Sequence, residues 1–91
     1  MRWLIDNRPE LVARAYKMLM PSGYIIQKLT GKFSMNRPRM SLTSLSDIRT
    51  GEWSREIAKK AEIPFSLLPT PYDPCDIVGG VTEEAAHITG L

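Results

Sequence analysis

Prolines and glycines divide this chain of 91 residues into short segments, and this division limits the chain to short helices and strands. Seven prolines and six glycines are spread over the sequence, and four of the prolines fall between Pro64 and Pro74. Proline removes a backbone donor and clashes with the preceding helical turn, so no long regular element can cross these positions. We therefore expect residues 64–69 to form at most one turn of helix, which leads into an irregular connector across the surface.

Apolar spacing predicts two helices and a strand in the first third of the chain. Five apolar residues recur at helical spacing after Pro9: Leu11, Val12, Ala15, Met18 and Leu19. Proline suits the first position of a helix, and the Pro-Ser-Gly sequence at 21–23 is expected to end this one. A second helix is predicted over 24–30, closed by Gly31 in the left-handed conformation. Residues 32–35 are expected to form a short strand.

The middle of the chain carries breaks and a turn. The sequence Asn-Arg-Pro-Arg at 36–39 is expected to interrupt any regular element. Leu42, Leu45 and Ile48 sit three apart, as in a helical turn, yet the Ser and Thr residues between them compete for backbone hydrogen bonds, which leaves residues 40–47 open. Residues 48–53 are predicted to form two arms about a glycine turn.

Two helices in the second half have clear caps. Ser54 is expected to cap a helix whose buried face is Ile57, Ala58 and Ala61. Thr82 is expected to cap a last helix that ends at Gly90. Acidic residues stand in both first turns, near the positive end of the helix dipole: Glu56, Glu83 and Glu84. Residues 77–81 form a strand candidate. The predicted class is α+β, mainly helical with a few short strands, as one piece over 1–91 with no internal boundary.

Composition excludes several kinds of protein. A hydrophobic content of 43% fits one small domain or part of a larger one. No stretch reaches the roughly 18 to 20 apolar residues of a membrane span, and no signal peptide opens the chain, so we expect no membrane partner and a cytoplasmic location. Cys75 is the single cysteine and His87 the single histidine, which excludes an internal disulfide and a zinc quartet.

Charge is distributed unevenly between the two halves. Residues 1–45 carry eight Lys or Arg against two Asp or Glu, a net +6, whereas residues 46–91 carry four against eight, a net −4. A basic half can bind a polyanion. Here the basic residues are scattered among apolar ones, so we interpret them as solvated faces and expect no nucleic-acid partner.

No residue pattern supplies a catalytic site. Gly79-Gly80 is the one glycine pair and lacks the spacing of a phosphate-binding loop, so a bend is the expected role. No sequence motif pairs His87 with Cys75 or with a serine as a catalytic nucleophile. None of the ten acidic residues stands out as a general base. We therefore assign no catalytic, no cofactor-binding and no metal residue.

One nucleic-acid alternative lies at residues 55–63, which look like the first half of a helix-turn-helix. Glu62 occupies the turn position that glycine often holds, and the second helix would meet Pro69 and Pro71 before completing two turns. Base readout needs a longer rigid helix in the groove. We keep DNA binding as the weaker hypothesis.

The order of landmarks along the chain resembles a known family. The landmarks are Trp3-Leu4, Pro9-Glu10, Ala13 and Ala15, Leu19 to Pro21, Tyr24-Ile25, Leu29 to Gly31, Asp47 to Trp53, Leu68-Pro69, Ile77 to Gly79, Val81-Thr82, Ala85-Ala86 and Thr89 to Leu91. This order is similar to the middle of the N-terminal domain of FGGY carbohydrate kinases, with the xylulose kinases closest. The similarity covers essentially the whole chain.

The resemblance implies a fragment of an actin-like, ribonuclease H-like kinase domain. The parent enzyme would transfer a phosphoryl group from ATP, with Mg, to a hydroxyl of a sugar, most simply a pentulose such as xylulose. In this family the phosphate loop precedes this segment and the catalytic aspartate follows it. The resemblance therefore implies that the 91-residue piece is inactive alone and has the remainder of the parent chain as its partner.

Two departures leave the sugar open. The family often has Lys-Asp where this chain has Ser22-Gly23, and an aspartate where it has Asn36. Serine can replace aspartate as a helix cap, and asparagine can make the same local turn.

We interpret the apolar opening at Trp3 as a start within an element, and expect exposed apolar edges at Trp3 and 77–81 that favour self-association. A free-standing binding or regulatory module remains the alternative function.

Overall fold

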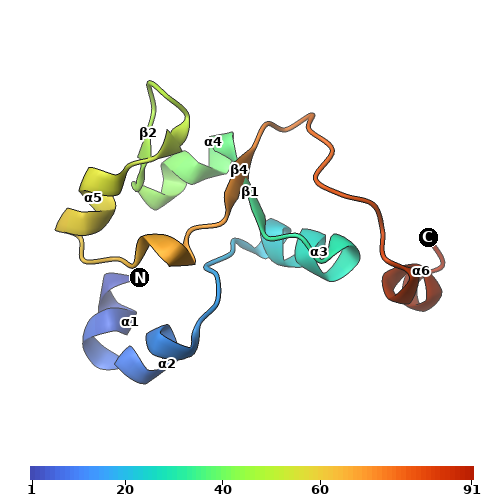
Figure 1. Cartoon of the computed structure of the whole chain (residues 1–91), viewed down its shortest axis with the longest axis horizontal. Coiled ribbons are helices and arrows are strands. Elements are labelled where there is room, and N and C mark those ends of the chain that lie inside the picture. The colour runs from blue at the N-terminus through green and yellow to red at the C-terminus, as the bar shows by residue number, and fades with distance from the viewer.

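The computed structural model describes residues 1–91 and consists of short elements throughout (Figure 1). The α-helices are α1 (Arg2–Asn7), α2 (Pro9–Arg14), α3 (Pro21–Thr30), α4 (Arg37–Met40), α5 (Arg55–Lys60) and α6 (Glu83–Thr89). The strands are β1 (Ser34–Asn36), β2 (Ser46–Asp47), β3 (Glu52–Trp53) and β4 (Thr70–Tyr72). Two 3₁₀ turns complete the set, η1 (Ser41–Thr43) and η2 (Phe65–Leu67). The predicted class, mainly helical with a few short strands, is confirmed.

The four strands form two small sheets of two strands each. Strands β1 and β4 pair in parallel, with Ser34 opposite Thr70 and Asn36 opposite Tyr72. Strands β2 and β3 form an antiparallel hairpin in which Ser46 faces Trp53. Helix α3 leads through a short loop into β1, and α4 follows β1 directly, so the parallel pair lies in the middle of the molecule (Figure 1).

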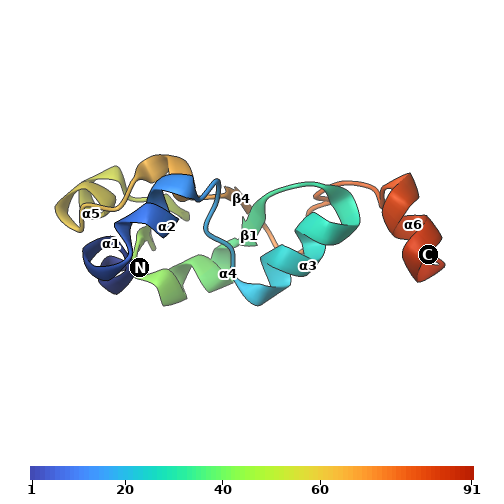
Figure 2. The same cartoon turned by 90° about the horizontal axis from the view of Figure 1, so that it is seen from below.

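The core is small and lies beside the parallel pair. Its centre is a cluster of Leu45, Ile63 and Leu68, against which Trp53 and Phe65 pack. Of the 91 residues only 11 are buried. The molecule measures 44 × 34 × 16 Å, which is a thin slab (Figure 2). A slab this thin leaves most side chains at the surface.

The exposed surface exceeds that of an ordinary monomer of this mass. The accessible surface is 6551 Å², whereas scaling with mass gives about 5,400 Å² for a monomer of 10.3 kDa. The radius of gyration is 14.5 Å, against about 12 Å for a compact domain of this length. The expected exposure at the two apolar edges is confirmed, since Trp3 is 66% and Ile77 is 91% exposed.

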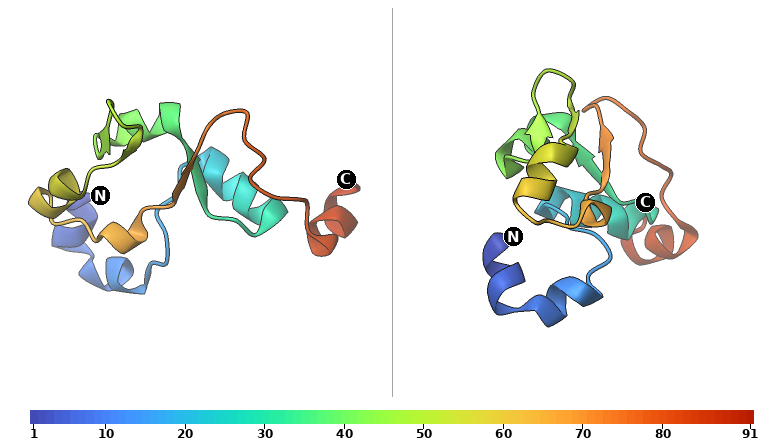
Figure 3. Two further views of the ribbon diagram at one scale, coloured as in Figure 1. Left: turned by 45° about the horizontal axis from the view of Figure 1, so that its top comes forward. Right: turned by 60° about the vertical axis from the view of Figure 1, so that its left-hand side comes forward.

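Helix α6 lies apart from the rest, at the opposite end of the molecule from α1 and α2 (Figure 3). It is joined to the body through α3, and the Thr82 amide donates to the carbonyl of Leu29 at 2.9 Å. Ala85 is its one buried residue. No helix is long and apolar enough to cross a membrane.

Three helix boundaries differ from the sequence prediction. The first amphipathic helix ends at Arg14, because Ala15 is extended and the amide of Met18 donates instead to the carbonyl of Leu67 at 2.7 Å. Pro21 begins α3 and does not end the preceding helix. The break expected at 36–39 is also wrong, because proline is tolerated in the first turn of a helix and the Asn36 side chain accepts from the amide of Arg39 to start α4.

In the last third of the chain, a strand lies where an irregular connector was predicted, and the predicted strand is absent. The expected irregular connector contains β4, because Pro71 lies in a two-stranded sheet where a missing donor costs little. The strand expected at 77–81 is absent, because this segment has no sheet partner. Apolar side chains of this segment lie at the surface, with Ile77 91% and Val81 46% exposed.

The predicted caps are confirmed. Gly31 closes α3 and Gly90 closes α6, both with left-handed φ angles of 73° and 77°. The Ser54 hydroxyl accepts from the amide of Ile57, and that of Thr82 accepts from Ala85. The glycine turn is confirmed as well, with Gly51 at φ 70° between β2 and β3.

Candidate functional site at the ends of the parallel strands

The carboxyl ends of β1 and β4 form the edge at which parallel sheets usually place their ligands. Arg37 comes directly after β1, and Asp73 comes directly after β4. Because the two strands are parallel, both side chains lie at the same edge of the sheet. This edge is therefore the candidate functional site of the chain.

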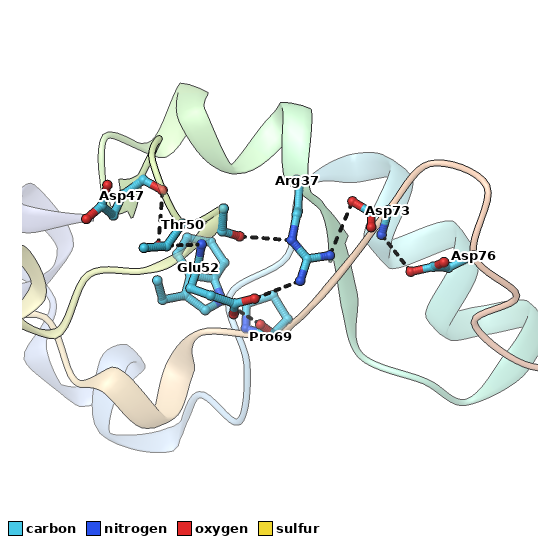
Figure 4. A network of polar contacts seen from close by, with 9 residues as sticks. Arg37, Asp47, Thr50, Glu52, Pro69, Asp73 and Asp76 are labelled. Atoms are coloured by element: carbon cyan, nitrogen blue, oxygen red, sulfur yellow. Dashed lines mark hydrogen bonds and ion pairs between the residues drawn. The ribbon is translucent and has the colours of Figure 1, made fainter.

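Arg37 joins three separate segments at this edge (Figure 4). Its Nε donates to the carbonyl of Gly51 at 3.1 Å, and its Nη2 donates to Glu52 Oε1 at 2.7 Å. Its Nη1 lies 3.3 Å from Asp73 Oδ1. The hydrogen bond to Glu52, with the charge of Asp73, raises the pKa of the Arg37 guanidinium. Arg37 therefore fixes the β2–β3 hairpin to the end of the parallel pair.

The neighbouring loops are closed by hydrogen bonds of their own (Figure 4). The amide of Asp73 donates to Asp76 Oδ2 at 2.8 Å, and the Trp53 indole N–H donates to the carbonyl of Pro69 at 2.6 Å. Asp47 accepts from the Arg49 side chain and amide, and these hydrogen bonds lower the pKa of its carboxyl. Each carboxylate at this edge thus has a partner within the chain.

A small cavity lies beside the Arg37 cluster, with a volume of about 100 Å³. Its polar lining comes from Ser22, Ser34, Asn36 and Asp73, with Tyr72 at the strand end. Sites for small molecules usually measure about 300 to 1,000 Å³. The residues present therefore form one wall of such a site at most.

No three His, Cys, Asp or Glu side chains lie close enough together to hold a metal ion. At the glycine pair 79–80, a Cβ on Gly79 would meet the Lys32 side chain at 3.2 Å, so Gly79 lies against the α3–β1 loop, whereas a Cβ on Gly80 would meet nothing within 4 Å. The residues present in this chain do not fit Mg-ATP.

The remaining sequence candidates lie far from one another. Cys75 is exposed in the coil after β4, and His87 is in the last turn of α6. The helix-turn-helix hypothesis is wrong in its second half, because α5 is followed by the three-residue turn η2 and not by a recognition helix. Glu62 does adopt the left-handed conformation at the intervening turn, with φ 54°.

The two departures from the family pattern have different outcomes. Asn36 makes the expected local turn, since its Oδ1 accepts from the Arg39 amide at 3.1 Å. The cap interpretation of Ser22 is wrong, because α3 already begins at Pro21 and has no side-chain cap. Gly23 has a steric role instead, since a Cβ there would lie 2.7 Å from the carbonyl oxygen of Ser34.

Sequence reasoning missed the pairing of Arg37 with Asp73. The sequence does carry a signal for this pairing, because Arg37 and Asp73 each follow a short extended segment and stand beside a proline. A strand over 32–35 was expected and corresponds to β1, but the prolines between Pro64 and Pro74 were interpreted as an irregular connector, so the end of β4 before Asp73 was not recognised. A parallel pairing between residues 36 apart also leaves no trace in local spacing.

Comparisons with known proteins give a consistent picture. The family model described as "FGGY family of carbohydrate kinases, N-terminal domain" matches residues 1–91. The chain is 30% identical over 89 residues to an L-fuculokinase of Escherichia coli K12, covering 98% of this chain and 19% of that protein. It is 33% identical over 85 residues to a xylulose kinase of Lactococcus lactis, covering 93% of this chain and 17% of that protein.

A solved structure has the same arrangement of elements. The xylulose kinase of Rhodospirillum rubrum superposes with a TM-score of 0.91 at 28% identity, over 99% of this chain and 18% of that one. The chain thus spans less than a fifth of the length of the relatives that it matches.

Proposed function

Because this chain belongs to the FGGY family of carbohydrate kinases, we propose that it is a structural segment of an enzyme that transfers a phosphoryl group from ATP to a sugar hydroxyl. The observation that carries this proposal is the family match over all 91 residues. The likeness to the Rhodospirillum rubrum xylulose kinase supports it independently, since the same short elements occur in the same order and arrangement.

The role of the segment is to hold one edge of the kinase lobe in shape. Arg37 ties the hairpin to the strand ends, and Trp53 ties β3 to the buried Pro69. Phosphoryl transfer also requires a phosphate cradle, a metal ion and a carboxylate that accepts the hydroxyl proton. The segment supplies none of these groups, and we propose that it has no activity alone and that ATP and Mg are bound by the rest of the kinase chain.

The substrate proposed for the kinase is a pentulose such as xylulose. Two of the three relatives described above are xylulose kinases, and the third is an L-fuculokinase. The small cavity beside Asn36 offers too few polar groups to select among ketoses. A cytoplasmic location remains a prediction.

The proposal is tested with the kinase chain that contains residues 1–91, supplied with ATP, magnesium and a panel of ketoses. ADP release is expected with a pentulose as the best substrate. No ADP release with any sugar, from a folded kinase chain, would contradict the proposed activity. Turnover restricted to a different sugar class would contradict the pentulose assignment and leave the kinase assignment intact.

A further inference from the structure

The small cavity at the carboxyl ends of β1 and β4 is lined by a buried polar side chain that has no partner in the chain. Ser34 is only 2% exposed, and it lines this cavity of about 100 Å³. Its hydroxyl makes no hydrogen bond within the chain, although every fully buried polar side-chain atom of the chain has a partner. The Ser34 oxygen is therefore not fully enclosed by protein, and its small accessible area faces the cavity.

The other polar groups of the lining supply both donors and acceptors. Asn36 Oδ1 accepts from the amide of Arg39 at 3.1 Å, whereas Asn36 Nδ2 makes no hydrogen bond within the chain. Asp73 presents a carboxylate that is 62% exposed, and one of its oxygens lies 3.3 Å from Arg37 Nη1. A neutral molecule that both donates and accepts hydrogen bonds matches this set of groups.

Size and charge select among such molecules. The cavity has room for about three water molecules of about 30 Å³ each, and it is smaller than the roughly 300 Å³ at which sites for small organic molecules begin. The Asp73 carboxylate disfavours an anion, and no three His, Cys, Asp or Glu side chains meet to hold a metal ion. An apolar side chain in the cavity would leave the Ser34 hydroxyl and the Asn36 amide without partners, which costs folding free energy.

We propose that this cavity is a binding site for ordered water, which supplies the hydrogen-bond partners of the Ser34 hydroxyl and of Asn36 Nδ2. Cavities lined by several polar groups hold water in folded proteins, whereas apolar cavities stay dry. The polar lining comes from α3, from β1 and from the segment after β4: Ser22, Ser34, Asn36 and Asp73. The bound water joins the start of α3 to the ends of both strands, where Gly23 already lies against the Ser34 carbonyl.

A crystal structure of the kinase chain that contains residues 1–91, at a resolution that shows ordered water, tests this proposal directly. Water density is expected in the cavity, with one molecule about 2.7 to 3.0 Å from Ser34 Oγ. A cavity without density, or one filled by a side chain, would overturn the proposal. Sugar atoms in the cavity after soaking with a ketose would also overturn it. These observations need no turnover, so a failure of the proposed kinase activity would not affect them.

The variant Ser34→Ala in the same kinase chain gives a second test, because a wet and a dry cavity predict effects of opposite sign. Loss of a hydroxyl that is hydrogen-bonded to water removes a net stabilising interaction, so the amides of β1 and β4 are expected to exchange about two- to tenfold faster. Loss of a hydroxyl without partners would relieve a desolvation cost instead, and slower or unchanged exchange would overturn the proposal.

Ser66→Ala is the matched control for this substitution. Ser66 is exposed in η2 and lies outside the lining of the cavity. Exchange at β1 and β4 is expected to be the same in this variant as in the wild type. An equal increase of exchange in Ser66→Ala and Ser34→Ala would overturn the proposal, because the effect would then not depend on the cavity.

Discussion

Replacing Gly23 by alanine should destabilise the chain although alanine favours helices. Gly23 is buried in the first turn of α3, and a Cβ there would lie 2.7 Å from the Ser34 carbonyl oxygen. That oxygen belongs to the backbone of β1, which is held in register with β4. The clash can be relieved only by moving α3 away from the parallel pair.

The magnitude follows from two opposing terms. Overpacking of this kind costs about 1 to 3 kcal/mol, and a contact with fixed backbone belongs at the upper end. Replacing glycine by alanine stabilises the helix by about 1 kcal/mol through the higher helix propensity of alanine. The expected net loss is about 2 kcal/mol, or a fall in unfolding midpoint of roughly 8 to 16 °C for a domain of this size.

Thermal unfolding followed by far-ultraviolet circular dichroism measures this loss. Gly80→Ala is the matched control, since a Cβ at Gly80 meets nothing within 4 Å and its φ is not left-handed. That variant should unfold at or slightly above the wild-type midpoint. A Gly23→Ala chain that unfolds at the wild-type midpoint or higher would refute the close approach of α3 to β1.

Four further predictions concern single contacts. Trp53→Phe should cost about 1 to 3 kcal/mol in urea unfolding, because the carbonyl of buried Pro69 loses its donor; a change below the error of the measurement would contradict this bond. Thr82→Ala should cost about 1 kcal/mol of α6 stability through loss of the cap, with faster amide exchange confined to α6. Arg37→Ala should speed amide exchange in the β2–β3 hairpin with little effect on global stability, since its partners are solvent-exposed. Unchanged exchange in the hairpin would argue against the linking role of Arg37. The pKa of Asp47 is lowered in the folded chain by its hydrogen bonds with Arg49, so its contribution to folding stability is present above the unfolded pKa and lost as pH falls below about 4. Asp47→Asn should therefore flatten the acid limb of a stability–pH titration. An unchanged acid limb would count against this role of Asp47.

The sequence predicted those parts of the fold that depend on local chemistry. The ends of α3 and α6 at Gly31 and Gly90, and the caps at Ser54 and Thr82, follow from backbone geometry and neighbouring hydrogen bonds. These features do not require knowledge of distant residues. The order of such landmarks was also sufficient to identify the family.

Features that depend on distant partners were not predictable in the same way. Local patterns could not indicate that Met18 hydrogen-bonds to Leu67, and α2 ends at Arg14 instead of continuing to the predicted end before Pro21. Pro71 suggested an irregular connector, yet β4 forms because β1 supplies its partner. For the same reason the Arg37 cluster was missed, since its three contacts come from the hairpin and from the segment after β4.

The exposed apolar faces connect the fold to the proposed function. A chain with 11 buried residues and a thickness of 16 Å has little core of its own. Its short elements nevertheless keep the arrangement found in a whole kinase, with a TM-score of 0.91. Both observations agree with a structural segment whose catalytic partners lie elsewhere.

We propose that this chain supports a sugar kinase without supplying its chemistry. Release of ADP by the purified 91-residue chain, with ATP, magnesium and xylulose, distinguishes this role from that of a self-contained enzyme. The expected result is a rate equal to that of the buffer blank, while the kinase chain containing the segment turns over under the same conditions. Sugar-dependent ADP release by the isolated chain, lost on Arg37→Ala or Asp73→Asn, would contradict it.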